Sequence, residues 1–123
     1  MYLINVYYSM HLTEKKINKL FYNWILLSII LVFSIIIVGG LTRLTNSGLS
    51  ITEWELVKGI LPPLSNSTWQ FYFDEYKKIP QYQILNFDME LDQFKTIFYW
   101  EYFHRILARF IGIFFLIPLI YFI

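Results

Sequence analysis

The sequence predicts an all-α membrane protein, specifically a fragment of a polytopic helical bundle. Hydrophobic residues make up 57% of the 123 residues and charged residues 15%, whereas soluble domains average about 45–50% and about 25%. Aromatic residues reach 21%, and a soluble core of this size cannot cover so much apolar surface. Two long apolar runs flank a polar, aromatic segment. We therefore expect lipid or partner helices to cover both runs.

The first apolar run, residues 20–41, contains no charged residue and is long enough to cross a bilayer as transmembrane helix 1. Its length and flanks differ from those of a cleaved signal peptide. Residues 1–19 form a leader in which Lys15, Lys16 and Lys19 precede the run. By the positive-inside rule this leader is cytoplasmic. Because the leader has no Arg, a multi-pass protein of the bacterial inner (plasma) membrane is favoured over a mitochondrial one.

Residues 42–96 are predicted to form an external loop with short amphipathic helices. Gly39-Gly40 is expected to close the first helix, either by allowing close helix approach or as a left-handed cap. Asn46-Ser47-Gly48 is typical of a turn. The two helices expected in this loop are Ile51–Lys58, ended by Gly59, and Ser67–Lys78, ended by Pro80.

Asp88 is expected to cap a last helix that starts near Met89 and enters the bilayer near Ile97. Residues 97–123 are predicted to be transmembrane helix 2. Its apolar run, Phe110–Ile123, stops without a polar flank and is shorter than the ~20 residues a span requires. The chain is therefore interpreted as a fragment with an incomplete second span.

Composition also limits the chemistry. The absence of cysteine excludes disulfides, thiolate metal sites and thiol relays. A net charge of +1 gives no electrostatic footprint for nucleic acid.

The candidate functional residues lie where the second apolar run begins. Glu101 and His104 are three residues apart, so they share a helical face and lie about 4.5 Å apart along its axis. Arg105 and Arg109 line a neighbouring face. Ionisable groups near the centre of a membrane cost about 2.5–3.5 kcal/mol each, which favours a functional site.

A histidine that faces the inside of a helical bundle is suited to be an axial haem ligand. The alternative is interfacial anchoring, in which the arginines reach toward the headgroups and Glu101 pairs with Arg105. His11 is the only other histidine. It is predicted to lie across the membrane from His104, so the two cannot ligate one iron.

The run Gly-Gly-Leu-Thr-Arg-Leu-Thr-Asn-Ser-Gly-Leu-Ser at residues 39–50 and the run Glu-Tyr-Phe-His-Arg at 101–105 resemble the heme A synthase family. The resemblance extends from about residue 38 to 112. It fits the cysteine-free, type 2 subgroup, and this chain would be the N-terminal part.

The resemblance implies two pseudo-symmetric four-helix bundles and an oxidoreductase that converts the C8 methyl of heme O into the formyl group of heme A. Water would supply the oxygen, and the product would serve terminal oxidase assembly. Glu101 would be catalytic, and His104 would ligate the iron. Guanidinium groups bind carboxylates well, so Arg43, Arg105 and Arg109 are candidates to bind haem propionates.

The resemblance further implies a resident heme b, with its iron, in the C-terminal half. Expected partners are heme O, heme O synthase, an electron donor and the lipid bilayer, and a homo-oligomer is left open. The fragment alone is expected to be inactive. Two alternatives remain: a b-type cytochrome that only transfers electrons, and a non-catalytic membrane assembly or transport subunit in which Glu101–Arg105 is structural.

Overall fold

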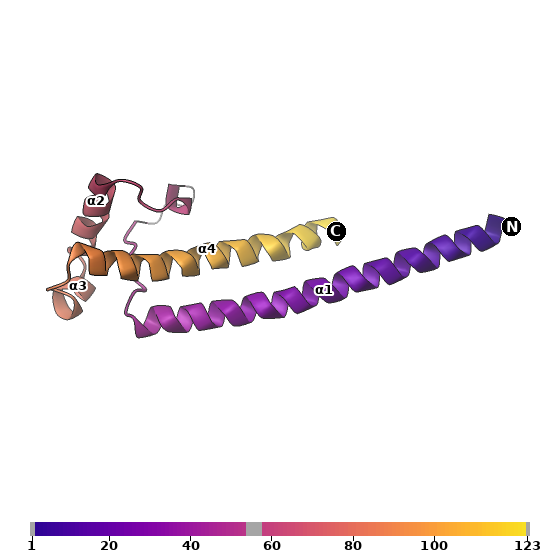
Figure 1. Ribbon diagram of the computed structural model, residues 1–123, viewed down its shortest axis with the longest axis horizontal. Coiled ribbons are helices and arrows are strands. Elements are labelled where there is room, and N and C mark those ends of the chain that lie inside the picture. The colour runs from indigo at the N-terminus through magenta and orange to yellow at the C-terminus, as the bar shows by residue number, and fades with distance from the viewer. Residues whose placement is uncertain (1, 54–57, 123) are drawn as a thin grey trace. The chain divides into compact units, whose positions relative to one another are not determined.

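The computed structural model describes residues 2–53 and 58–122, and these residues form helices and no strand. The helices are α1 (Tyr2–Leu44), α2 (Asn66–Tyr76), α3 (Pro80–Leu85) and α4 (Leu91–Phe122), with a 3-10 turn η1 (Lys58–Ile60) before α2 (Figure 1). The predicted all-α class is therefore confirmed. The chain divides into two compact units, of which the first ends at Ser34 and the second begins at Ile35.

Two helices are long and apolar enough to cross a membrane, at Ile4–Leu44 and Leu91–Tyr121. Helix α1 has 43 residues, so it is about 65 Å long, roughly twice the ~30 Å thickness of the hydrocarbon core. The expected leader is therefore helical and continuous with the first apolar run. Its cytoplasmic side remains a prediction.

In the first unit, side-chain hydroxyl groups of α1 bond back to its own main chain. The hydroxyl groups of Thr13 and Ser28 donate to the carbonyls four residues earlier, at 2.8 and 2.7 Å. His11 lies here on an exposed stretch, where its ring meets the ring of Tyr7 edge-on with centroids 6.2 Å apart.

Helix α1 does not end at Gly39-Gly40 as the sequence suggested, because both glycines are helical and neither has a positive φ. It ends at Leu44. Asn46 has a φ of 51° and takes the left-handed position after the helix. The N–H groups of Asn46 and Ser47 donate back into the last turn, at 3.2 and 3.0 Å. The left-handed cap is therefore Asn46, since its short polar side chain tolerates this conformation.

The segment between α1 and α4 differs in detail from the prediction. Helix α2 begins at Asn66 rather than Ser67, because the hydroxyl of Ser65 accepts from the N–H of Thr68 at 3.2 Å. Pro80 begins α3 at a position where its missing N–H costs nothing. Of the helix expected at Ile51–Lys58, Ile51–Glu53 are not helical and 54–57 lie outside the described residues.

Helix α4 begins at Leu91, three residues after Asp88, so Asp88 does not cap it. Glu90 precedes the helix instead. Its N–H donates to the side-chain oxygen of Gln93 at 3.0 Å, which is one half of a capping box.

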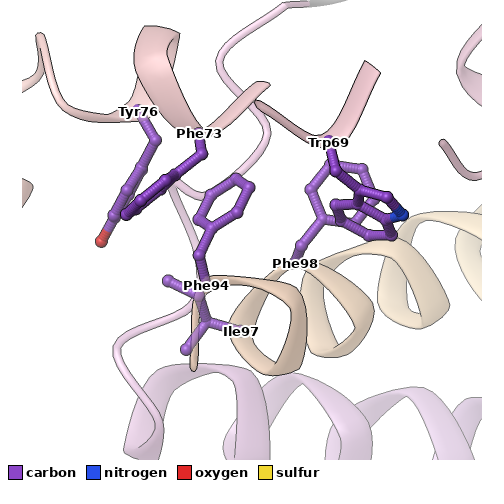
Figure 2. Close-up of a cluster of buried hydrophobic side chains, with 6 residues drawn as sticks. All are labelled: Trp69, Phe73, Tyr76, Phe94, Ile97 and Phe98. Carbon is purple, nitrogen blue, oxygen red and sulfur yellow. The ribbon is translucent and has the colours of Figure 1, made fainter. Parts of the chain in front are cut away.

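A cluster of six buried side chains fixes α2 against the first turns of α4. Figure 2 shows side chains from α2 meeting those that rise from α4. The ring centroids of Trp69 and Phe98 lie 4.9 Å apart, and the ring of Phe94 lies 5.1 Å from those of both Phe73 and Tyr76. Such aromatic pairs contribute about 0.5–1.5 kcal/mol each beyond their area burial. The members are Trp69, Phe73, Tyr76, Phe94, Ile97 and Phe98.

Candidate functional site

A cavity of about 660 Å³ lies within the second unit, where the last turns of α1, the turn after it, α3 and α4 meet. Four of the five predicted site residues line it, and Arg109 does not. The lining residues are Gly39, Thr42, Arg43, Asn46, Gly48, Leu49, Pro80, Gln81, Ile84, Leu85, Glu101, His104 and Arg105.

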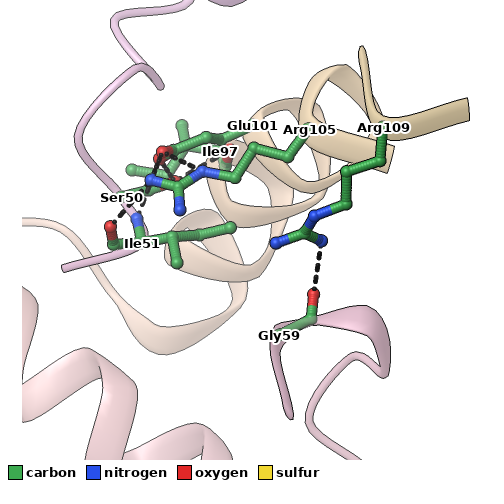
Figure 3. A network of polar contacts seen from close by, with 7 residues as sticks. All are labelled: Ser50, Ile51, Gly59, Ile97, Glu101, Arg105 and Arg109. Carbon is green, nitrogen blue, oxygen red and sulfur yellow. Dashed lines mark hydrogen bonds and ion pairs between the residues drawn. The ribbon is translucent and has the colours of Figure 1, made fainter. Parts of the chain in front are cut away.

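Glu101 is the most completely bonded charged group of this site, with only 3% of the residue exposed. One carboxylate oxygen, Oε2, accepts from the hydroxyl of Ser50 and the N–H of Ile51, both at 2.8 Å. The other, Oε1, accepts from Nε of Arg105 at 2.9 Å and from its Nη2. An ionised carboxylate only accepts hydrogen bonds, and four donors match it (Figure 3).

Arg105 connects α4 to the segment that follows the cap of α1. Besides Glu101, its Nη2 donates to the carbonyl of Ile51 at 3.1 Å. Ile51 is therefore held at both its N–H and its C=O. Because Asn46, Gly48 and Leu49 line the cavity immediately before this point, the Glu101–Arg105 pair holds one wall of the cavity in place.

Two more side chains of α4 bind the same loop farther along. Arg109 donates from Nη1 to the carbonyl of Gly59 at 3.0 Å (Figure 3), and the hydroxyl of Tyr102 donates to the carbonyl of Ile60 at 2.5 Å. We use the name loop latch for the hydrogen bonds by which Glu101, Tyr102, Arg105 and Arg109 hold residues 50, 51, 59 and 60. The propionate role expected for the two arginines remains a prediction, and their contacts here are with main-chain groups and Glu101.

His104 lies in the cavity wall, half-buried, one turn after Glu101. A Cβ built on Gly39 of α1 would lie 3.2 Å from its Nε2. No cluster of three or more His, Cys, Asp or Glu residues that could hold a metal occurs in the residues described. His104 offers one imidazole to this cavity, and an imidazole can ligate a haem iron whose other ligands are porphyrin nitrogens.

Besides Arg105, a second arginine, Arg43, lines the cavity. It is exposed, and no hydrogen bond or ion pair joins its guanidinium to another described residue. It is thus better placed than Arg105 to receive an anionic group of a ligand.

Sequence reasoning anticipated the pairing of Glu101 with Arg105 but missed its other two partners, Ser50 and Ile51. Ser50 was recognised as part of a motif but given no role, although it is fully buried. Glu101 and Ser50 are separated by 51 positions, so their meeting depends on tertiary structure.

The model of the COX15-CtaA family of cytochrome oxidase assembly proteins matches residues 22–123. The chain belongs to this family. The resemblance found in the sequence is thus confirmed, and the matched residues include both motifs, 39–50 and 101–105.

Relatives of this COX15-CtaA chain carry the name heme A synthase. The protein from Pelagibacter ubique is 60% identical over 99 residues, covering 80% of this chain and 30% of the relative. The protein from Flavobacterium johnsoniae is 50% identical over 111 residues, covering 89% and 33%. The chain thus spans about a third of the length of these curated relatives. No solved structure matches it.

Family membership and the two exposed apolar helices indicate a bacterial membrane protein.

Proposed function

We propose that this chain forms part of a heme A synthase, an oxidoreductase that converts the C8 methyl of heme O into the formyl group of heme A. The observation that carries the proposal is that Glu101, His104 and Arg43 open on one cavity of about 660 Å³. The names of the relatives support the same reaction.

The residues of the cavity fit a haem. Leu49, Ile84 and Leu85 leave 60–73% of their surfaces exposed along it, which is apolar area that a macrocycle would cover. His104 supplies an imidazole for the iron, and Arg43 supplies a guanidinium for a propionate. Apolar walls with a few polar groups are typical of a cofactor-sized site.

Glu101 is proposed to act through its charge. Oxidising a methyl group to a formyl group with oxygen from water releases four electrons and four protons, and positive charge develops on the methyl carbon. A carboxylate fixed by four hydrogen bonds can stabilise that charge without reorganising. Accepting a proton would first require one of these bonds to break, so charge stabilisation is the role we assign.

The reaction balance also bears on the partners. With water as the oxygen source, the redox partner must accept four electrons and four protons leave. Two successive monooxygenase steps with dioxygen would instead each consume two electrons from a donor. Heme O synthase is proposed to supply the substrate, heme O. The product, heme A, is proposed to serve terminal oxidase assembly. The resident heme b implied by the family is assigned to the C-terminal half, and none of the described residues is proposed to hold it. We further propose a multi-pass location in the bacterial inner membrane with a cytoplasmic N-terminus.

The test uses the full-length gene product in cells that make heme O but lack their own heme A synthase. His104→Ala should lower both bound heme O and heme A, because the iron loses a ligand. Glu101→Gln should retain heme O but lower heme A by roughly 10²–10³-fold per folded protein, as expected for one lost electrostatic contact in a water-poor site. The measurement is the heme O to heme A ratio in extracted pigments.

Glu75→Gln is the matched control, since it removes a carboxylate paired with Lys78 three residues away in the external segment. A normal pigment ratio in Glu101→Gln would remove Glu101 from the mechanism. The Glu101–Arg105 pair would then have the structural role that the assembly-subunit alternative assigns to it. Normal heme O binding in His104→Ala would contradict the axial assignment.

A further inference from the structure

The two adjacent glycines of α1 have different surroundings. Both lie inside the helix with negative φ, so neither is needed for an unusual backbone conformation. A glycine costs a helix about 1 kcal/mol relative to alanine, so a glycine inside a helix calls for a packing or functional reason. A Cβ on Gly39 would lie 3.2 Å from Nε2 and 3.6 Å from Cδ2 of His104, whereas a Cβ on Gly40 would have nothing within 4 Å.

The difference follows from the face of α1 on which each glycine lies. Gly39 lines the cavity, together with Thr42 and Arg43, which are three and four residues farther along the helix. Gly40 is exposed and does not line it. The missing side chain of Gly39 thus leaves space beside one particular edge of one particular ring.

We propose that Gly39 is a positioning residue, whose missing side chain leaves room beside Nε2 for His104 to present this nitrogen to the iron of heme O. This inference rests on the proposed function, because it takes His104 as an axial ligand. The 3.2 Å separation is tighter than ordinary van der Waals contact. A methyl group at position 39 therefore displaces the imidazole by a few tenths of an ångström or screens the coordinating nitrogen.

The expected loss of heme O affinity follows from how far the added methyl group turns the His104 imidazole from its preferred rotamer. Holding a side chain about 30° away from its preferred rotamer weakens a binding equilibrium that depends on it by about 2- to 10-fold. A displacement of a few tenths of an ångström turns the ring by less than this, so Gly39→Ala should weaken heme O binding by up to about that factor. It should also shift the absorption and electron paramagnetic resonance signals of the bound iron, because both respond to the orientation of an axial imidazole.

Gly40→Ala is a closely matched control. It adds the same methyl group one residue away in the same helix, and it brings the same gain in helix propensity. The full-length gene product of each variant is purified in detergent and titrated with heme O, with absorbance followed in the Soret region. Gly40→Ala should bind heme O with the affinity and spectra of the unchanged protein.

Two outcomes overturn the inference while leaving the proposed function intact. In the first, Gly39→Ala and Gly40→Ala bind heme O alike, whereas His104→Ala loses binding. In the second, Gly39→Ala fails to fold and the double variant Gly39→Ala with His104→Ala also fails, although removing the imidazole removes the clash. If His104→Ala binds heme O normally with an unchanged spectrum, the axial assignment fails and the inference fails with it. Recovery of folding in the double variant supports the contact.

Discussion

Arg105 should contribute more to the stability of the loop latch than Arg109 does, although both arginines bind the same loop. Arg105 supplies two of the four hydrogen bonds on Glu101 and one to the carbonyl of Ile51. Arg109 supplies one, to the carbonyl of Gly59. The comparison of Arg105→Met with Arg109→Met therefore separates the loss of a buried ion pair from the loss of a single hydrogen bond.

The magnitudes follow from burial. The side chain of Glu101 is 4% exposed, so Arg105→Met leaves a buried carboxylate with half of its donors. Removing one partner of a buried pair costs about 3–5 kcal/mol. Losing a single hydrogen bond to a charged donor costs about 1.5–3 kcal/mol when neither group stays deeply buried. A difference of about 2 kcal/mol corresponds to roughly 30-fold in the opening equilibrium of the loop.

Hydrogen exchange detects this opening directly, because the N–H of Ile51 donates to Glu101. Exchange is measured by mass spectrometry on peptides that cover residues 48–53, with the full-length gene product in detergent. Arg105→Met should exchange roughly 30-fold faster there than Arg109→Met. Equal exchange in the two variants, or unchanged exchange in Arg105→Met, would refute the assignment of Arg105 as the main anchor.

Two further predictions concern the segment between α1 and α4. Burial raises the pKa of Tyr76 above its ordinary value of 10.0. The folded state therefore favours the neutral phenol. The resulting stabilisation is present below pH 10 and is lost as the pH rises through the raised pKa. Tyr76→Phe should therefore flatten the fall in melting temperature above pH 10. Near neutral pH the same substitution should cost about 1 kcal/mol, because it removes the hydrogen bond that Asn86 donates to the phenol oxygen. Parallel pH profiles of the two proteins would argue against this. At the end of α1, Asn46→Ala should destabilise by about 1–2 kcal/mol because of its left-handed backbone, whereas Asn46→Gly should be nearly neutral. Equal melting temperatures for these two variants would contradict the cap.

The helices of this chain were largely predictable, because their signals are local. An uncharged run of this length permits little except a spanning helix, and Pro80 had to interrupt a helix or begin one. The prediction for Gly39-Gly40 left two roles open, close approach or a left-handed cap. The structure shows close approach for Gly39, whereas Asn46 is the cap. A glycine pair alone does not contain the information that separates these roles.

The site was predictable only in part. The pairing of Glu101 with Arg105 follows from their spacing of four residues on one helix. The contact of Glu101 with Ser50 and Ile51 does not, since it depends on how α2 packs on α4 and returns the loop to α4. Which group each arginine bonds likewise depends on where the main-chain carbonyls lie. Those positions cannot be predicted from composition and periodicity.

The loop latch binds almost entirely through peptide groups. Three of the four residues that α4 contacts in the loop, Ile51, Gly59 and Ile60, contribute an N–H or a C=O and no side-chain atom. The side chain of Ile51 also packs against the buried cluster. Substitutions should therefore be tolerated mainly at positions 59 and 60, since only a carbonyl is used there and every amino acid offers one. Inserting a residue between Gly59 and Ile60 should be far more harmful, because it would move one of these two adjacent carbonyls out of register with its partner on α4. Selection at positions 59 and 60 should accordingly act on their spacing more than on side-chain identity.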